Sequence, residues 1–348
     1  MAKVGIITFL HNDNYGSSLQ AYALQRAVRE MGHECAHLDY RPDRGEKIRN
    51  LIASGNSPKL ILEGMRKKSV KAGQQGAREK SAAIPAFYAR RMKLTAECRN
   101  LAELSERSGA FDTLICGSDQ IWNPVWLNEA YFLTFAGAGT RKIAYAPSLG
   151  VRTMPAESKQ RKIRKWTEGF AAISVREAEG ADLMEKITGK RPAVMPDPVC
   201  LMRKEEWEEI AGEAPAGEPY ILCYFIGENG KYREKAREIQ KETGMRILEI
   251  PVTAEGYASR FEKLEGLGPE EFLGAVRGAG CFCTDSFHGL VFGTLMGVRT
   301  EAMRRYREDD PESKNSRVDH FLRLTREKGT DTLREEGRKW LGEKLGSF

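Results

Sequence analysis

The chain has 348 residues, of which 41% are hydrophobic and 30% are charged, and its formal net charge is +6. This length exceeds what one ordinary hydrophobic core organises, so two domains are expected. The composition is typical of a soluble globular protein, and the mild basic excess favours anionic small molecules or membrane surfaces. No basic, aromatic-rich module of the kind that binds RNA or DNA occurs, so no nucleic-acid partner is expected.

The cysteines and the apolar runs of the sequence indicate the cellular compartment in which the protein is expected. Seven cysteines, an odd number without paired spacing, argue against a disulfide framework and for a reducing environment. Cys281 and Cys283 share one face of a predicted strand, but no second ligand pair has metal-site spacing, so buried thiols are expected and no metal. The apolar run at 3–10 is too short for a signal peptide, and no stretch of about 18 apolar residues occurs. A cytoplasmic protein is therefore expected.

Apolar strand patterns alternate with helical patterns along the chain, which is typical of α/β units with parallel sheets. In the first half, strands are predicted at 3–9, 35–40, 111–116, 142–147, 171–175 and 193–195. The clearest helix spans 17–31, because Leu19, Ala23 and Ala27 repeat on one face. Six strands suffice for one doubly wound sheet, so residues 1–200 are expected to form an N-terminal Rossmann-like domain.

The pattern breaks at 197–219, where Asp197-Pro198 and a series of glycines and prolines indicate a connection between domains. Further strands are predicted at 220–226, 246–250, 281–284 and 299–303. Helices are predicted between and after them at 230–243, 269–277, 287–296 and 315–326. This second, smaller Rossmann-like unit is expected to span 215–330. A C-terminal helix within 331–348 can pack back on the first domain.

Residues 44–99 do not fit the alternation. They carry fourteen Lys or Arg against four Asp or Glu and show few strand signals. One interpretation is a solvated helical insertion, since charge runs are usually exposed faces. The other is a basic rim that attracts an anionic lipid-linked or polymeric sugar.

Site residues are expected where the predicted strands end, because parallel α/β sheets bind ligands at the carboxyl ends of their strands. The first such junction is Asn14-Tyr15-Gly16-Ser17-Ser18, preceded by His11, which could also touch a ligand. It is neither a dinucleotide fingerprint nor a Walker loop. Free N–H groups at the start of the next helix suit an anion or a sugar, while ordinary helix capping by Ser17 is the alternative.

Two further junctions carry groups suited to acid–base and anion chemistry. The second is Gly117-Ser118-Asp119-Gln120-Ile121-Trp122, where Asp119 can act as a base for a hydroxyl and Trp122 can stack on a sugar. Alternatively, Asp119 caps a turn and Trp122 fills the core. At the third, Arg176-Glu177, the guanidinium either grips phosphate or carboxylate or makes a surface ion pair.

The sharpest signal is Thr284-Asp285-Ser286-Phe287-His288-Gly289, where a strand runs directly into an apolar helix. Ser286 is expected near the N-cap and His288 in the first turn, where N–H groups and the helix dipole favour an anion. A lone histidine is more often structural, but His288 shares its junction with Asp285 and Ser286 and is expected to be functional. The remaining histidines that are expected to be structural are His33, His37 and His320.

Taken together, these junctions resemble the polysaccharide pyruvyl transferase family. The matching blocks, in order, are Asn14-Tyr15-Gly16 with 19–24, 117–123, 174–177, Asp197-Pro198, 268–272, 284–289 and 314–317, and they span about residues 3–325. The resemblance implies two Rossmann-like domains that face each other across a cleft, as in GT-B glycosyltransferases, with the acceptor on the side of 1–200 and the donor on the side of 215–330. It also implies phosphoenolpyruvate as the donor of pyruvate.

The resemblance implies roles for individual residues. His288 would contact the donor and act as acid or phosphate ligand, Asp119 would be the base and Arg176 the anion clamp. Several family members carry Arg two positions before this histidine, where this chain has Ser286, so donor charge must be met from elsewhere. The candidates for that charge are Arg304, Arg305 and Arg317. The substrate-binding residues predicted in all are Ser286, Arg176, Ser118, Gln120, Asn14, Tyr15, Gly16, Asp285 and Arg317.

The expected function is transfer of pyruvate from phosphoenolpyruvate to sugar hydroxyls as a ketal, in cell-surface or exopolysaccharide biosynthesis. The acceptor would be a sugar, a lipid-linked sugar or an oligosaccharide, with peripheral membrane association as a further expectation and no cofactor. Two alternatives remain open. One is a nucleotide-sugar-dependent GT-B glycosyltransferase, which would hold a diphosphate at the helix that starts at Phe287. The other is a non-catalytic glycan- or nucleotide-binding relative, which the absence of Arg at position 286 favours.

Overall fold

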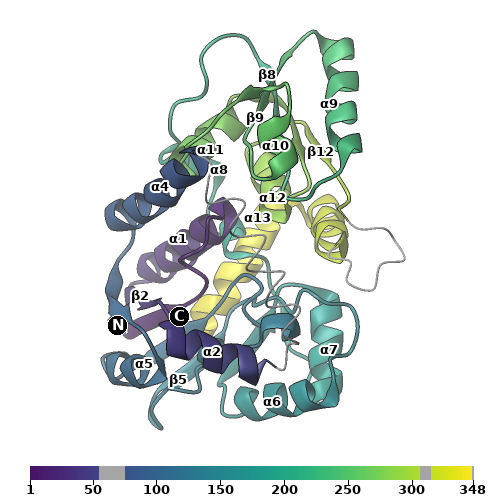
Figure 1. Ribbon diagram of the computed structural model, residues 1–348. Helices are drawn as coiled ribbons and strands as arrows, with labels where there is room; N and C mark the ends of the chain where they lie inside the picture. The colour runs from purple at the N-terminus through teal and green to yellow at the C-terminus, as the bar shows by residue number, and fades with distance from the viewer. Residues whose placement is uncertain (55–74, 306–314, 347–348) are drawn as a thin grey trace.

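The computed structural model describes residues 1–54, 75–305 and 315–346, which form two lobes (Figure 1). The N-terminal lobe is built on a seven-stranded sheet of order β3-β2-β1-β4-β5-β6-β7, and the C-terminal lobe on a five-stranded sheet of order β10-β9-β8-β11-β12. The recorded strand pairs of both sheets are parallel. The predicted fold class, α/β with two Rossmann-like domains, is confirmed.

The N-terminal lobe alternates strands with helices. Its strands are β1 (Lys3–Ile7), β2 (Glu34–Tyr40), β3 (Leu94–Cys98), β4 (Thr113–Cys116), β5 (Arg141–Ala144), β6 (Ala172–Val175) and β7 (Ala193–Val194). Its helices are α1 (Tyr15–Glu30), α2 (Arg44–Ala53), α4 (Gln75–Arg91), α5 (Leu101–Ser108), α6 (Glu157–Thr167) and α7 (Ala178–Thr188), with short turns η1 (Pro124–Trp126) and η2 (Glu129–Phe132). The central strands β1 and β4 are almost wholly buried, as expected for a parallel sheet covered on both faces.

The C-terminal lobe repeats this plan on a smaller scale. The chain reaches it through η3 (Pro198–Leu201) and α8 (Lys204–Glu208). Its strands are β8 (Tyr220–Tyr224), β9 (Arg246–Glu249), β10 (Glu262–Lys263), β11 (Ala279–Thr284) and β12 (Thr300–Ala302). Its helices are α9 (Gly230–Thr243), α10 (Ala254–Ala258), α11 (Pro269–Arg277) and α12 (Phe287–Leu295), and α13 (Asn315–Leu345) follows.

Helix α13 ties the two lobes together. It is kinked at Gly329, whose φ of 77° interrupts the helix, so the helices predicted at 315–326 and 331–345 form one bent element. Beyond the kink, Leu341 and Leu345 share a core cluster with Val4 of β1. The end of α13 therefore packs on the N-terminal lobe, against the sheet that contains β1.

The region predicted as a basic helical insertion contains a strand that the sequence pattern did not reveal. Strand β3 pairs with β2 at the edge of the sheet, and its residues are mostly half-buried or exposed, so the apolar alternation is weak. Helix α4 is no solvated surface element, because Ile84 and Phe87 lie in the core cluster that joins both lobes. The prediction of an entirely helical, solvated insertion was therefore wrong for the described part, and its remainder, 55–74, lies outside the described residues.

His37 shows what a structural histidine looks like in this fold. It is fully buried, and its Nε2 lies 3.0 Å from the carbonyl oxygen of Ala21. Burial lowers the pKa of His37 from 6.5 to about 4. Between these values the unfolded chain binds more protons than the folded one, so the free energy of unfolding falls as the pH falls. The loss attributable to His37 is expected to reach about 3 kcal/mol.

Urea unfolding at pH 7 and pH 4.5 measures this loss. A His37→Gln variant keeps an N–H donor but cannot titrate, so its stability should fall less than that of the unmodified protein over the same interval. Equal losses in the two proteins would contradict the assignment.

Candidate functional site

The carboxyl ends of the two sheets meet at a polar seam between the lobes. The clearest contact joins α1 to α12, where Gly16 lies directly against His288. A methyl group added at Gly16 would lie 2.3 Å from Cγ of His288, well inside van der Waals contact. Two junctions that are more than 270 residues apart in sequence are therefore packed together.

His288 is held in the first turn of α12. Ser286 caps this helix, since its Oγ accepts a hydrogen bond of 3.2 Å from the N–H of Gly289. The imidazole is 7% exposed, and its Nε2 lies 3.3 Å from Oδ2 of Asp197. Asp197 follows β7 and caps η3, where its Oδ1 accepts from the N–H of Val199 at 3.1 Å. The histidine is thus oriented by a carboxylate that is itself fixed.

Arg176, at the end of β6, completes this charged cluster. Its Nη1 donates to Oδ2 of Asp197 at 2.5 Å, and its Nε donates to Oε1 of Glu177 at 3.0 Å. Burial alone would raise the pKa of Asp197, but His288 and then Arg176 outweigh burial and lower that pKa well below its usual value. Similarly, burial would lower the pKa of Arg176, but Glu177 and Asp197 outweigh it and raise that pKa. Both side chains are therefore charged at neutral pH.

Asp119, at the end of β4, faces the start of α1. Its Oδ2 accepts a hydrogen bond of 2.5 Å from Oγ of Ser17. Asn14 caps α1, with its Oδ1 accepting from the N–H groups of Gly16 and Ser17. The φ of Asp119 is +62°, a left-handed conformation that a non-glycine residue adopts at a cost of about 1–3 kcal/mol. Such strain at a buried carboxylate is typical of functional sites.

Arg317 reaches the cluster from the first turn of α13. Its guanidinium carbon lies 5.7 Å from the ring centroid of Phe287, and that of Arg176 lies 4.5 Å from the same centroid. Both side chains are at least nine-tenths buried, and burial together with the charge of Arg176 lowers the pKa of Arg317 to about 10. Arg317 therefore stays charged at neutral pH despite its cationic neighbour.

The two arginines carry unused hydrogen-bond donors. Nε of Arg317 and Nη2 of Arg176 are buried and have no hydrogen-bond partner among the residues that the structure describes. A buried donor without a partner is costly, more so when it is charged. Two guanidinium groups thus lie over one aromatic ring, and each keeps a buried donor for which an anionic ligand would supply the acceptor.

The structure distinguishes the three arginines that were candidates for the donor charge. Arg305 donates from Nε to Oδ2 of Asp285 at 2.9 Å, and Asp285 also accepts from the N–H groups of Ile226 and Gly227. Arg304 is exposed and pairs with Asp319 at 3.1 Å. Of these three, Arg317 is the one that lies over the ring of Phe287, as Arg176 does.

The other predicted binding residues make contacts within the protein. Ser118 is buried, with its Oγ donating to the carbonyl of Ala146 at 2.6 Å, and Oε1 of Gln120 accepts from Asn123 at 3.1 Å. The ring of Tyr15 stacks on that of Phe272 in the core between the lobes, with centroids 4.6 Å apart. That Ser118, Gln120 and Tyr15 bind substrate stays a prediction. Trp122 is in the core, where it stacks on Phe132 at 4.8 Å.

Asp197 is the site residue whose role sequence reasoning missed, because Asp197-Pro198 was interpreted as the start of a connection between the domains. The connection does lie between β7 and β8, but its first residues are buried. A signal was available, since Asp197 follows a predicted strand at the same edge of the sheet as Asp119 and Arg176.

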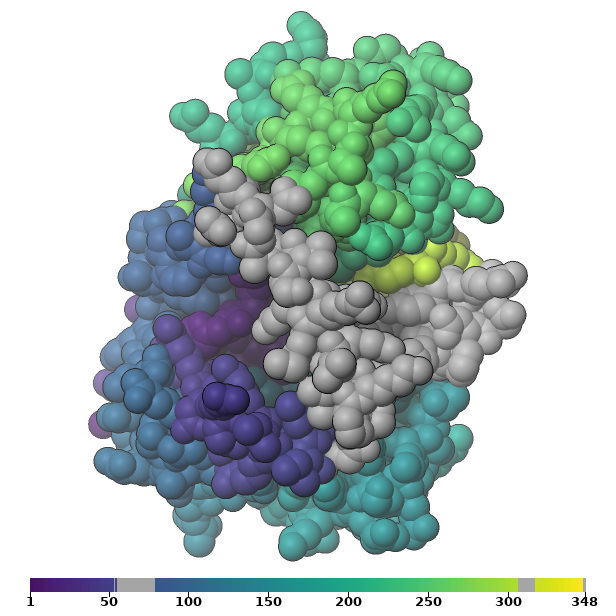
Figure 2. All heavy atoms as spheres, viewed as in Figure 1, coloured from purple at the N-terminus to yellow at the C-terminus, as the bar shows by residue number. Residues whose placement is uncertain are grey.

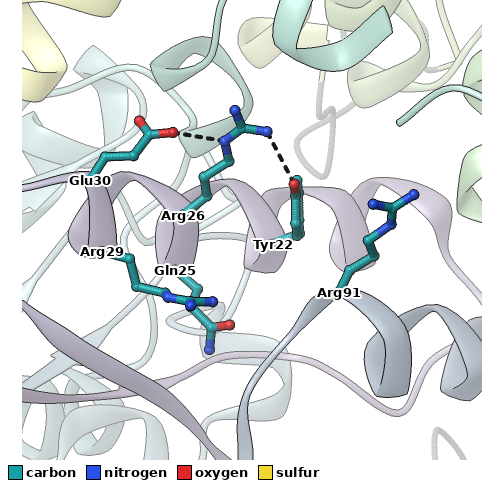
Figure 3. A pocket seen from close by; sticks show the side chains of 6 residues that line it. All are labelled: Tyr22, Gln25, Arg26, Arg29, Glu30 and Arg91. Carbon is teal, nitrogen blue, oxygen red and sulfur yellow. Dashed lines mark hydrogen bonds and ion pairs between the residues drawn. The ribbon is translucent and has the colours of Figure 1, made fainter. Parts of the chain in front are cut away.

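A separate hollow lies on the outer side of α1 and has a different character (Figure 3). It is lined by Tyr22, Gln25, Arg26, Arg29, Glu30 and Arg91. Arg26 donates to Glu30 at 2.7 Å and to Tyr22 at 3.3 Å, and Arg91 donates to Glu270 at 2.7 Å. Arg26 and Arg91 are thus engaged with protein groups, whereas Arg176 and Arg317 at the seam each keep one buried donor without a partner among the described residues.

Neither a metal site nor a membrane-spanning helix is found in the described parts of the chain. Within the described residues, no group of three or more His, Cys, Asp or Glu side chains is arranged to hold a metal ion. The seven cysteines are buried and have free thiols. None of the helices in the described parts of the chain is long and apolar enough to cross a bilayer.

Several solved structures resemble this chain. The UDP-GlcNAc 2-epimerase from Neisseria meningitidis bound to UDP-GlcNAc is 9% identical, with 99% of each chain covered and a TM-score of 0.49. The UDP-GlcNAc 2-epimerase from Methanocaldococcus jannaschii is 12% identical, with 97% of this chain and 99% of that chain covered and a TM-score of 0.48. A spinosyn rhamnosyltransferase is 10% identical, with 97% and 95% covered and a TM-score of 0.41.

Sequence comparison identifies the family. No protein among the curated sequences matches this chain significantly. The family model described as polysaccharide pyruvyl transferase matches residues 14–300, which include the junctions at Gly16, Asp119, Arg176, Asp197 and His288. The chain therefore belongs to the polysaccharide pyruvyl transferase family and is a transferase.

Proposed function

We propose that this protein transfers pyruvate from phosphoenolpyruvate to two hydroxyls of a sugar, forming a pyruvate ketal and releasing phosphate, in cell-surface or exopolysaccharide biosynthesis. The observation that carries this proposal is the pair of buried guanidinium groups, Arg176 and Arg317, with unused donors beside His288. Phosphoenolpyruvate carries a carboxylate and a phosphate close together, and two adjacent guanidinium groups suit such a dianionic ligand.

The proposed reaction consists of two successive additions of a hydroxyl group to C2 of the donor. A proton from His288 goes to the methylene carbon C3 of the donor, which becomes a methyl group and leaves C2 cationic. A first sugar hydroxyl attacks C2 and loses its proton to Asp119. The bond between C2 and the phosphate oxygen then breaks, a second hydroxyl attacks C2, and the second hydroxyl proton leaves with the phosphate. The products are one cyclic ketal and one phosphate.

Each step of the proposed reaction uses side chains at the seam between the lobes. The guanidinium groups of Arg176 and Arg317 would hold the anions of the donor and stabilise the charge that moves to the leaving phosphate. Asp197 would fix the orientation of the His288 ring through Nε2. Asp119 would act as the base, with Ser17 fixing its carboxylate. The proposed reaction uses no metal and no cofactor, since these side chains supply its acid, its base and its cations.

The contact between Gly16 and His288 yields a prediction about positioning. A Gly16→Ala substitution places a methyl group 2.3 Å from Cγ and Nδ1 and 2.5 Å from Cβ of His288, so the ring must move. We expect kcat to fall about tenfold or more, since small displacements of a catalytic group are costly. Steady-state phosphate release measures this effect.

A Gly230→Ala variant is the matched control, because Gly230 also lies in the first turn of a helix but would place its methyl group in open space. It should keep full activity. An unchanged kcat in Gly16→Ala would show that the ring position does not matter for turnover.

The activity test uses the purified full chain with phosphoenolpyruvate and a panel of sugar acceptors. Phosphate release together with the mass gain of a pyruvate ketal on the acceptor is the expected result. Release of a nucleoside diphosphate from a nucleotide sugar would replace the proposal with a glycosyltransferase. Sugar binding without turnover of either donor would identify a non-catalytic relative.

A further inference from the structure

A second hollow opens beside the seam, at the carboxyl ends of β1 and β2. It has a volume of about 390 Å³, which falls within the range of roughly 300–1,000 Å³ typical of small-molecule sites. In Figure 2 the purple N-terminal segment is visible in a recess of the surface, flanked by blue and indigo parts of the N-terminal lobe. The lining groups that matter below are Phe9, His11, Asn12, Tyr40, Arg41 and Tyr131.

Hydrogen bonds connect this hollow to Asp119. Nδ2 of Asn12 donates to Oγ of Ser17 at 3.2 Å, and Oγ of Ser17 donates to Oδ2 of Asp119 at 2.5 Å. Asn12 therefore forms a wall of the hollow on one side and supports the predicted base on the other. A group bound in the hollow against Asn12 would lie two hydrogen bonds from Asp119.

The Asn12 side chain also has an unused acceptor. Its Oδ1 is buried and has no hydrogen-bond partner among the described residues. Unsatisfied buried polar atoms are rare in folded proteins and call for an explanation such as a ligand that binds there. A hydroxyl group donating to this oxygen would satisfy it.

One side of the hollow carries aromatic rings. The rings of Phe9 and Tyr131 meet edge to face with centroids 5.0 Å apart, and those of Tyr40 and Tyr131 do so at 6.0 Å. The backbone carbonyl of Tyr131 accepts from Nε1 of the core residue Trp122, which holds this segment in place. Such rings offer an amphipathic surface to the C–H face of a sugar.

The other side of the hollow carries charged groups that already pair with one another. Asp39 accepts from Nε and Nη2 of Arg41, each at 3.1 Å, and is hydrogen-bonded to Nε2 of His11. Arg41 also lies 3.5 Å from Glu97. With two carboxylates against Arg41 and the nearby Lys47, the described residues around the hollow carry no strong net charge. Such a fixed array of donors and acceptors suits neutral hydroxyl groups better than a phosphate.

We propose that this hollow is the acceptor subsite, that it binds a neutral sugar ring, and that Asn12, His11 and Arg41 select its hydroxyls. The ring packs on the aromatic side, one hydroxyl donates to Oδ1 of Asn12, and others contact His11 and Arg41. The attacking hydroxyl is thereby delivered next to Asp119. This inference rests on the proposed function, since it names the sugar side of the same reaction.

The test compares His11→Gln and Arg41→Met with the control Arg99→Met. Arg99 is exposed and pairs with Glu97 but does not line the hollow. With phosphoenolpyruvate as donor and methyl glycosides of glucose, galactose and mannose as acceptors, both hollow variants should raise the acceptor KM about tenfold, as expected for a lost hydrogen bond of about 1.4 kcal/mol. The KM for phosphoenolpyruvate should not change, and the control should match the unmodified protein.

Direct binding separates this inference from the proposed function. Saturation-transfer NMR of the same methyl glycosides, without donor, should show binding to the unmodified protein and weaker binding to both hollow variants. Binding of that pattern without any pyruvate transfer would support the subsite while contradicting the proposed function. Transfer with an unchanged acceptor KM in both folded variants, or the absence of glycoside binding to the unmodified protein, would overturn the subsite.

Discussion

Replacing His288 with glutamine is expected to lower kcat about 1,000-fold while the protein stays folded, because loss of a general acid typically costs 10² to 10⁴ in rate. Glutamine retains an N–H donor that can face Asp197, so the buried carboxylate keeps a partner on that side in addition to Arg176. Phosphate release under saturating donor and acceptor gives kcat, and thermal unfolding shows whether the fold is retained.

His33→Gln is the matched control for this variant. His33 is also largely buried, but its Nδ1 accepts from the backbone N–H of Ala2 at 3.1 Å, far from the seam in the fold. Its replacement should leave kcat unchanged. A His288→Gln protein that retains kcat within about threefold would show that His288 is a structural histidine, as most lone histidines are.

Replacing Arg317 with methionine is expected to weaken donor binding without weakening the fold. A charged hydrogen bond contributes about 1.5–3 kcal/mol, so its loss should raise the KM for phosphoenolpyruvate about 10- to 150-fold. In the ligand-free protein Arg317 is a buried cation beside Arg176, and methionine of similar length can keep the apolar contact with Phe287. The free energy of unfolding should therefore stay the same or rise.

Arg304→Met is the control, since Arg304 is the exposed candidate that pairs with Asp319. It should leave both the KM for phosphoenolpyruvate and the stability unchanged. The combination of higher KM with undiminished stability marks Arg317 as a ligand-binding group. A loss of several kcal/mol in stability with an unchanged KM would instead make Arg317 a structural residue.

The fold and several site junctions could be predicted from the sequence because they depend on local patterns. Apolar strands followed by polar residues indicated the junctions at Asp119, Arg176 and His288, and parallel topology placed all of them at carboxyl ends of strands. Strand β3 was not predicted because it is an edge strand with exposed polar residues. Its pairing with β2 depends on the sheet already being present.

The detail of the site could not be predicted, because it depends on packing between segments far apart in sequence. Nothing in the sequence around Arg304, Arg305 and Arg317 says which guanidinium is buried, and only the docking of α13 decides it. Likewise, the pairing of Asp197 with His288 joins residues 91 positions apart. The hollow at Asn12 depends on the rings of Phe9 and Tyr131, which come from separate strand-end segments.

A crystal structure of the protein with phosphoenolpyruvate bound tests the central claim most directly. The account predicts donor oxygens within hydrogen-bond distance of Nε of Arg317 and Nη2 of Arg176, with the methylene carbon beside His288. The carboxylate of Asp119 should remain on the side of the hollow at Asn12. Phosphoenolpyruvate bound elsewhere, for example in the hollow at Arg26 and Arg91, with no ligand on these two donor atoms, would contradict the account.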